Sequence, residues 1–192
     1  MKTIVVFNQK GGVGKTSTVV NLMAEFSTEK KKKVLAINLD AQCNLTSFCG
    51  VRETEKSVLH WLLHSANLEE VIVRTNYGDL ILAEEALQLE LLRFASIPAF
   101  VIRLRDLIGA IPAGKYDYIL IDCPPTVNQL TAAALVAGDY VSIPTEAEFF
   151  SAAGVGKIAD TIEQIKPLNQ NLKALGVLLV YIYTGARRNL TG

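Results

Sequence analysis

The chain has 192 residues, of which half are hydrophobic and a fifth charged, and its 19 basic and 19 acidic residues give a formal net charge of zero. These values predict one well-packed α/β domain and give no support for nucleic-acid binding over the whole surface. No apolar run approaches the roughly 18 residues that span a bilayer, and no secretory leader pattern opens the chain. We therefore expect a cytoplasmic protein with no membrane partner.

A phosphate-binding loop is predicted near the start of the chain. Residues 4–7 form an apolar, largely β-branched run that predicts a buried strand, and the glycine-rich sequence KGGVGKTS, residues 10–17, leads from it into a helical pattern. Glycine backbone can wrap a phosphate, and the N-terminus of the helix adds unpaired N–H donors and partial positive charge. In such a loop Lys15 reaches the β- and γ-phosphates of ATP, and the Thr16 hydroxyl ligates Mg²⁺.

A second strand brings an acid to the same edge. Residues 15–29 have the apolar spacing of a helix that packs on a sheet, and we interpret the lysines at 30–33 as its solvated C-terminal end, where cations are favoured. Residues 34–39 then predict a buried strand that ends at Asp40. Open α/β sheets bind ligands at the carboxyl ends of their strands, so a carboxylate beside the phosphate loop is a candidate functional residue.

We interpret the stretch from residue 51 to residue 100 as structural framework rather than as part of a functional site. The elements expected here and just beyond are a short helix capped by Ser57, a strand over 80–83, a helix over 84–95 and a helix from Pro98 to 108. His60 and His64 lie four residues apart, a spacing that can bind zinc. No further ligands surround them in a recognisable pattern, so surface or half-buried histidines are the favoured interpretation.

Asp122 is the next candidate functional residue, and it follows a predicted strand over residues 118–121. An acid in this place can hold the Mg²⁺ shell, usually through water, because Mg²⁺ sheds its waters reluctantly. Two more strands are expected over 139–145 and 175–183, and a long helix over 148–165. Because strands alternate with helices throughout, we expect a mostly parallel sheet with helices on both faces.

Four segments resemble motifs of the ParA/MinD family of deviant Walker A ATPases, and of its ParA-type, Soj-like partition ATPases above all. They are KGGVGKT at 10–16, NLDAQCNLT at 38–46, YDYILIDCPP at 116–125 and IPTEAEFFSAAG at 143–154. The first lacks the leading glycine of the strict phosphate loop and carries an additional lysine, Lys10. The second departs from the family's D-x-D-P-Q-x-N at Asn38, which replaces the first acid, and at Ala41, which replaces the proline.

The resemblance implies a P-loop NTPase-type fold and a set of site residues. Lys10 would cross to the phosphates of a partner subunit, and Asp40 would orient the attacking water. Glu146 and Glu148 would face the nucleotide or the subunit interface. The predicted site residues are Lys10, Lys15 and Asp40 for catalysis; Gly11, Gly12, Val13, Gly14, Lys15, Thr16, Ser17, Glu146 and Glu148 for the nucleotide; and Thr16, with Asp122 and Asn38 through water, for Mg²⁺.

The implied function is an ATP- and Mg²⁺-dependent ATPase that forms a homodimer on binding ATP and partitions or positions DNA or another cargo. Turnover would be slow and stimulated by an adaptor of the ParB type, with non-specific DNA as a family partner and association with the nucleoid. Family members usually continue with another strand and one or two helices. We therefore expect residues 1–192 to form a single domain that lacks this part, which makes DNA binding a weaker expectation than ATP binding.

Two other functions stay open. One is an amidoligase-type P-loop synthetase, such as dethiobiotin synthetase, although Lys10, Gln42 and Asn44 favour the partition ATPase. The other is a nucleotide-locked dimer that barely hydrolyses ATP and acts as a binding switch, which Asn38 and the short C-terminal part suggest.

Overall fold

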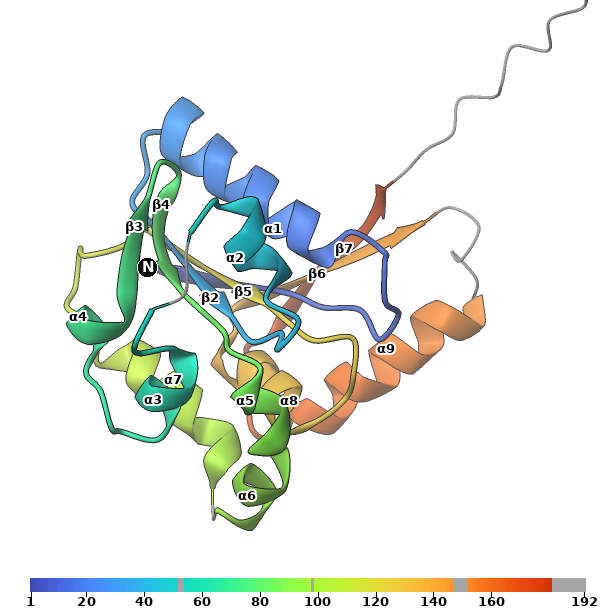
Figure 1. Ribbon diagram of the computed structural model, residues 1–192. Coiled ribbons are helices and arrows are strands. Elements are labelled where there is room, and N and C mark those ends of the chain that lie inside the picture. The colour runs from blue at the N-terminus through green and yellow to red at the C-terminus, as the bar shows by residue number, and fades with distance from the viewer. Residues whose placement is uncertain (52–53, 98, 147–151, 181–192) are drawn as a thin grey trace, which may run out of the picture.

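A seven-stranded sheet forms the centre of the part of the chain that the computed structural model describes, residues 1–51, 54–97, 99–146 and 152–180, with backbone only at 152–155 (Figure 1). Its strands lie in the order β3-β4-β2-β5-β1-β6-β7. Their bounds are β1 Lys2–Val6, β2 Val34–Asn38, β3 Ile72–Thr75, β4 Gly78–Ile81, β5 Tyr118–Asp122, β6 Tyr140–Glu146 and β7 Lys173–Val180. Neighbouring strands are parallel except for the β3–β4 hairpin. The predicted mostly parallel α/β sheet is therefore confirmed.

The register of the central strands sets the position of the site. Asp122 at the end of β5 is paired with Val6 of β1 on one side and with Asn38 of β2 on the other. The carboxyl ends of these three strands therefore meet at one edge of the sheet. The loop after β1, the Asp40 segment after β2 and Asp122 itself lie together there, as expected for an open α/β sheet.

Helices cover both faces of the sheet, as predicted. Figure 1 shows α1 (Lys15–Ala24) and α2 (Asn44–Phe48) on one side, and α7 (Phe100–Gly109), α8 (Gln129–Ala137) and α9 (Ala152–Ile165) on the other. Alternate residues of β1 belong to two separate hydrophobic clusters: Ile4 and Val6 to the cluster that contains α1 residues, and Val5 to the one that contains α7 and α8 residues. This alternation follows from the two-residue repeat of a strand.

Several local boundaries differ from the predicted ones. The helix expected over 15–29 is α-helical only to Ala24 and continues as a π-helix, η1 (Glu25–Glu29). The helix expected over 84–95 is divided into α5 (Ala86–Leu89) and α6 (Leu91–Ser96), and Pro98 lies outside the described residues. The short elements α4 (Leu68–Val71), α2 and β3 were not predicted, because four or five residues show too little periodicity to be recognised.

Ser57 caps α3 (Val58–Leu62) as predicted, since its hydroxyl accepts a hydrogen bond from the backbone N–H of Leu59. The last strand is described to Val180, and the rest of its predicted span lies outside the described residues. A search of the described residues finds no helix that is both long and apolar enough to cross a membrane.

Candidate nucleotide-binding site

The loop between β1 and α1 has the backbone that a phosphate cradle needs. Gly12 and Gly14 have φ angles of 77° and 82°, which residues with a side chain rarely adopt. Gly14 is the N-cap of α1, and the first turn closes through the Thr18 N–H, which donates to the Gly14 carbonyl at 2.9 Å. The earlier N–H groups of the helix therefore have no partner within it and are available to an anion.

Two residues missed by the sequence analysis hold this loop in place. Asn8 donates from Nδ2 to the carbonyl of Pro144 on β6 at 2.8 Å and accepts from the Lys10 N–H at 3.0 Å. Gln9 donates from Nε2 to the hydroxyl of Thr161 on α9 at 3.0 Å. The available signal was a pair of amide side chains directly after a buried strand, but their partners are more than 130 residues away in the chain.

Lys15 is buried inside the loop, with 7% of its surface exposed. Its ammonium donates to the Lys10 carbonyl at 2.9 Å. Burial lowers the pKa of Lys15 from its usual value, whereas the negative charges of Asp122 and Asp40 raise it. A buried cation in a phosphate loop can bind the β- and γ-phosphates, and this role of Lys15 stays a prediction.

Thr16 and Asp122 are joined directly. The Thr16 hydroxyl donates to Asp122 Oδ2 at 2.8 Å, while Asp122 Oδ1 is buried and has no hydrogen-bond partner among the described residues. A hydroxyl and a carboxylate are oxygen ligands of the kind that Mg²⁺ prefers, and an unpaired buried carboxylate oxygen is suited to a metal-bound water. The residues present therefore fit the predicted metal.

Asp122 makes the metal-free protein sensitive to pH. Burial raises the pKa of Asp122 to about 7, and Asp40 acts in the same direction, whereas the Thr16 hydrogen bond and Lys15 oppose it. Because the unfolded carboxyl loses its proton near pH 4, Asp122 should lower the free energy of unfolding by up to about 4 kcal/mol as the pH rises from about 4 to 7. Asp122→Asn should remove this loss and make the variant more stable than the parent at pH 8.

The measurement is urea unfolding of parent and variant at intervals from pH 4 to pH 8, with a chelator present. Asp106→Asn is the matched control, because Asp106 has an exposed carboxylate. A stability difference between Asp122→Asn and the parent that stays constant over this range would show that the buried carboxyl does not titrate there.

Asp40 completes the site. It is 7% exposed, and its Oδ1 accepts from the Gln42 N–H at 3.0 Å. Together with Gln42, Asn44 and Phe48, it faces the phosphate loop across a hollow of about 320 Å³. The structure therefore brings Lys15, Thr16, Asp40 and Asp122 to one place, as the sequence predicted.

Comparison with known proteins identifies the family. A family model described as "AAA domain" matches residues 1–174. The chain is 37% identical over 194 residues to the "Sporulation initiation inhibitor protein Soj" of Bacillus subtilis, which covers 98% of this chain and 75% of that protein. It is 35% identical to the "Chromosome partitioning protein ParA" of Caulobacter vibrioides, over 93% of this chain and 69% of that protein. The chain belongs to the ParA/MinD family.

The same fold occurs in a solved structure with nucleotide. The "Cobyrinic Acid a,c-diamide synthase from Mycobacterium smegmatis with bound ADP and Magnesium" superposes with a TM-score of 0.87 and 32% identity, covering 93% of this chain and 74% of that one. The P-loop NTPase-type fold is thus shown for this ParA/MinD-family member. The chain is also 37% identical to the "Chromosome-partitioning ATPase Soj" of Thermus thermophilus, over 96% of this chain and 71% of that protein, which supports ATPase activity in general terms. The roles of individual residues remain predictions.

Asn38 is the main departure from the family pattern, and it is fully buried. Its Oδ1 accepts from the Asp40 N–H at 2.9 Å, which leaves the Nδ2 donor without a partner among the described residues. A buried donor does not satisfy metal-bound water, which itself donates. Asn38 therefore fits a hydrated Mg²⁺ less well than the family's acid would.

Asn38→Asp should lower the Mg²⁺ concentration for half-maximal ATP turnover and raise the rate, because it replaces a donor with an acceptor. It should also destabilise the Mg²⁺-free protein, since a second buried carboxylate then lies opposite Asp122 in the sheet. Mg²⁺ titrations of turnover and of thermal stability test both effects, with Asn171→Asp as an exposed control. Superimposable turnover curves would show that position 38 does not take part in metal binding.

Glu146 lies close to Lys10. The Lys10 ammonium is 3.8 Å from Glu146 Oε2, and the two side chains are 42% and 29% exposed. Glu146 therefore lies beside Lys10 of the phosphate loop, and its predicted position toward the nucleotide or the subunit interface stays a prediction. Glu148 lies outside the described residues.

Proposed function

We propose that this protein is an ATP- and Mg²⁺-dependent ATPase that dimerises on binding ATP and partitions or positions DNA or another cargo. The observation that carries the proposal is the meeting of the phosphate loop, Lys15, Asp40 and the Thr16–Asp122 pair at one edge of the sheet. Family membership supports the same activity. The binding of DNA, stimulation by a ParB-type adaptor and association with the nucleoid are parts of the proposal that rest on the family resemblance, and the names of the relatives add only chromosome partitioning.

Within one protomer, the site residues would have separate roles in binding ATP and in hydrolysing it. The loop N–H groups and Lys15 bind the β- and γ-phosphates, while Thr16 and Asp122 would hold Mg²⁺, which offsets negative charge on the phosphates when bound. Asp40, which faces the loop across the hollow, orients the water that attacks the γ-phosphate. The backbone N–H of Gln42 donates a hydrogen bond to Asp40 Oδ1 and so holds the Asp40 carboxylate in position.

Lys10 would act on the second nucleotide of the dimer. Its ammonium lies beside Glu146 and is partly exposed, whereas the ammonium of Lys15 is inside the loop. An exposed cation at the rim can reach the phosphates of a facing protomer, where it would act as an arginine finger does in trans. ATP binding and dimerisation are coupled in this scheme, because Lys10 reaches its second partner only when the facing site holds ATP.

The test is to measure mass in solution and steady-state turnover under matched conditions. We expect the mass to double with ATP and Mg²⁺, to return to that of the monomer with ADP, and turnover to be slow. Repeating turnover with duplex DNA tests the DNA proposal. A protein that binds ATP but stays monomeric would overturn the dimeric mechanism.

A second candidate is an ATP-dependent amide-forming synthetase, which the name of the Mycobacterium smegmatis structure favours. The same experiment separates the two functions. A synthetase needs its carboxylate and amine substrates for turnover and does not need ATP-dependent dimerisation. Dimerisation with almost no turnover would instead indicate the nucleotide-locked switch.

A further inference from the structure

Gly14 differs from the other glycines of the phosphate loop in its surroundings. A Cβ atom placed on Gly11 or on Gly12 would have no described heavy atom within 4 Å. A Cβ atom placed on Gly14 would lie 3.2 Å from Cγ2 of Val180 and 3.6 Å from its Cβ and Cγ1. The branched side chain of Val180 therefore packs directly against Gly14, although the two residues lie near opposite ends of the described chain.

Val180 ends β7, a strand whose side chains are mostly exposed. Of its eight residues, only Val177 and Val180 are half-buried. Val177 packs against the hydrophobic cluster that contains α7 and α8 residues, on one face of the sheet. Residues three apart in a strand point to opposite faces, and Val180 accordingly meets the loop before α1 on the other face. The phosphate loop is thus what shields the Val180 side chain.

The contact lies where the phosphate loop turns into α1. Gly14 is the N-cap of α1 and has a φ angle of 82°, and the cap has no side-chain hydrogen bond. Its carbonyl accepts from the backbone N–H and from the hydroxyl of Thr18, at 2.9 and 2.8 Å. Gly14 also lines the nucleotide hollow, whose described lining residues do not include Val180. Val180 therefore supports Gly14 from outside the hollow, just before Lys15.

The neighbouring strand contacts the other end of the loop. Val180 is paired in the sheet with Glu146, whose Oε2 is 3.8 Å from the Lys10 ammonium. The ends of β6 and β7 thus contact the loop at Lys10 and at Gly14. Because the Lys15 ammonium donates to the Lys10 carbonyl at 2.9 Å, a shift of Gly14 relative to Lys10 would move this ammonium within the loop.

We propose that Val180 is a positioning residue of the phosphate loop: its side chain holds Gly14 so that Lys15 and the first N–H groups of α1 converge on the phosphates of the nucleotide. A glycine has no side chain of its own to restrict its backbone, so packing from outside can supply the restriction. Holding a binding loop in its bound conformation raises affinity, because less ordering remains to be done on binding. The inference rests on the phosphate-binding part of the proposed function and needs neither dimerisation nor turnover.

Hydrogen exchange in the nucleotide-free protein tests the contact itself. Val180→Ala should speed the exchange of the amides of residues 12–18, and above all of the Thr18 N–H, which donates to Gly14. Val177→Ala is the matched control, because it removes the same two methyl groups from β7 on the other face of the sheet. Equal exchange of residues 12–18 in the two variants would overturn the proposal, since a general loosening of β7 would then explain the change.

Calorimetric titration with inorganic tripolyphosphate and with ATP tests the effect on binding. Val180→Ala should weaken both ligands by about fivefold, the change expected when the packing of roughly one buried methyl group is lost. Val177→Ala should bind as the parent does. Val180→Thr, which keeps the branched shape, should restore the parent's affinity. Melting temperatures show that each variant is folded.

The outcomes separate this inference from the proposed function. Unchanged affinity in Val180→Ala would overturn the role of Val180 even if the parent dimerises and hydrolyses ATP. A parent that binds tripolyphosphate, with weaker binding in Val180→Ala alone, but neither dimerises nor hydrolyses ATP would overturn the proposed function and support the role of Val180. A parent that binds neither tripolyphosphate nor ATP would overturn both.

Discussion

Lys15→Ala is expected to abolish detectable ATP binding. Lys15 is the buried cation of the phosphate loop, and its ammonium already donates to the loop carbonyl of Lys10. Removing it leaves the phosphates near the carboxylates of Asp40 and Asp122 without the compensating charge. Hydrogen bonds to charged groups contribute about 1.5–3 kcal/mol each, so the loss of contacts to two phosphates should weaken affinity by at least about 100-fold.

Calorimetric titration with ATP and Mg²⁺ checks this result. Lys32→Ala is the matched control, because Lys32 is an exposed lysine on the run before β2 and should bind as the parent does. Thermal unfolding of the variant shows whether it is folded. A folded Lys15→Ala protein with the parent's affinity would mean that the loop does not bind the phosphates of ATP.

Lys10→Ala is expected to leave ATP binding by the monomer nearly unchanged while removing ATP-dependent dimerisation and turnover. Its ammonium lies at the rim of the loop, 3.8 Å from Glu146, and so is not needed inside the cradle. The turnover should fall by about 10³-fold or more if Lys10 stabilises the transferring phosphoryl group in trans. The measurements are calorimetry for ATP, mass in solution with ATP, and steady-state hydrolysis.

Mixing experiments separate a role in trans from a role in cis. A Lys10→Ala protomer that can bind ATP should recover part of its turnover when mixed with Lys15→Ala protomers, which keep Lys10 but lack a working cradle. Lys32→Ala again serves as the control for the loss of one positive charge. A Lys10→Ala protein that dimerises with ATP and hydrolyses it at the parent rate would rule out the trans role.

Local patterns in the sequence were enough to predict the fold class and most of the candidate site. The strand–glycine–helix pattern at 4–17 and the strands that end beside Asp40 and Asp122 carry their signal within short stretches. A parallel sheet places the carboxyl ends of its strands at one edge, so these patterns also predicted that the loop and the two acids meet. The family resemblance rested on the same stretches.

The tertiary structure alone decided which side chains contact one another across the chain. Three such contacts each join residues more than 100 positions apart in the chain. They are the hydrogen bond from Asn8 to Pro144, the ion pair of Lys10 with Glu146, and the hydrogen bond from Thr16 to Asp122. Burial likewise depends on the packed sheet: it raises the pKa of Asp122, and it encloses Asn38 Nδ2, which has no hydrogen-bond partner in the described part of the chain.

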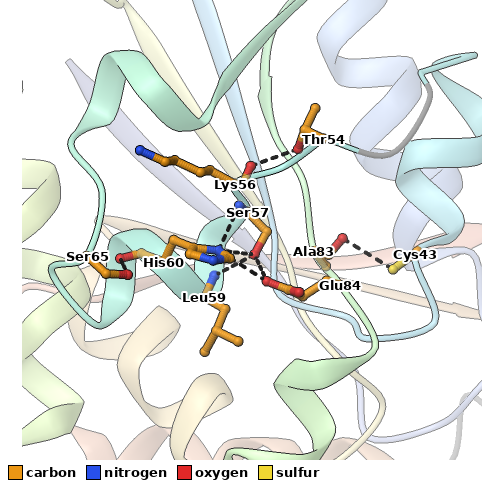
Figure 2. A network of polar contacts seen from close by, with 9 residues as sticks. All are labelled: Cys43, Thr54, Lys56, Ser57, Leu59, His60, Ser65, Ala83 and Glu84. Carbon is orange, nitrogen blue, oxygen red and sulfur yellow. Dashed lines mark hydrogen bonds and ion pairs between the residues drawn. The ribbon is translucent and has the colours of Figure 1, made fainter.

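A hollow of about 770 Å³ between α2 and the segment after β4 shows most clearly that sequence patterns do not reveal contacts between distant segments. Ser57, His60 and Glu84 had no motif in common, and Thr46 lay within the family's second motif without a role of its own. Thr46, Ser57 and Glu84 line one hollow because β4 pairs with β2 and so brings the segment after β4 against α2, and His60 lies beside Ser57 and Glu84 (Figure 2). Strand pairing is a contact between distant parts of the chain, and sequence periodicity reports only which face of an element is buried, not what it is buried against.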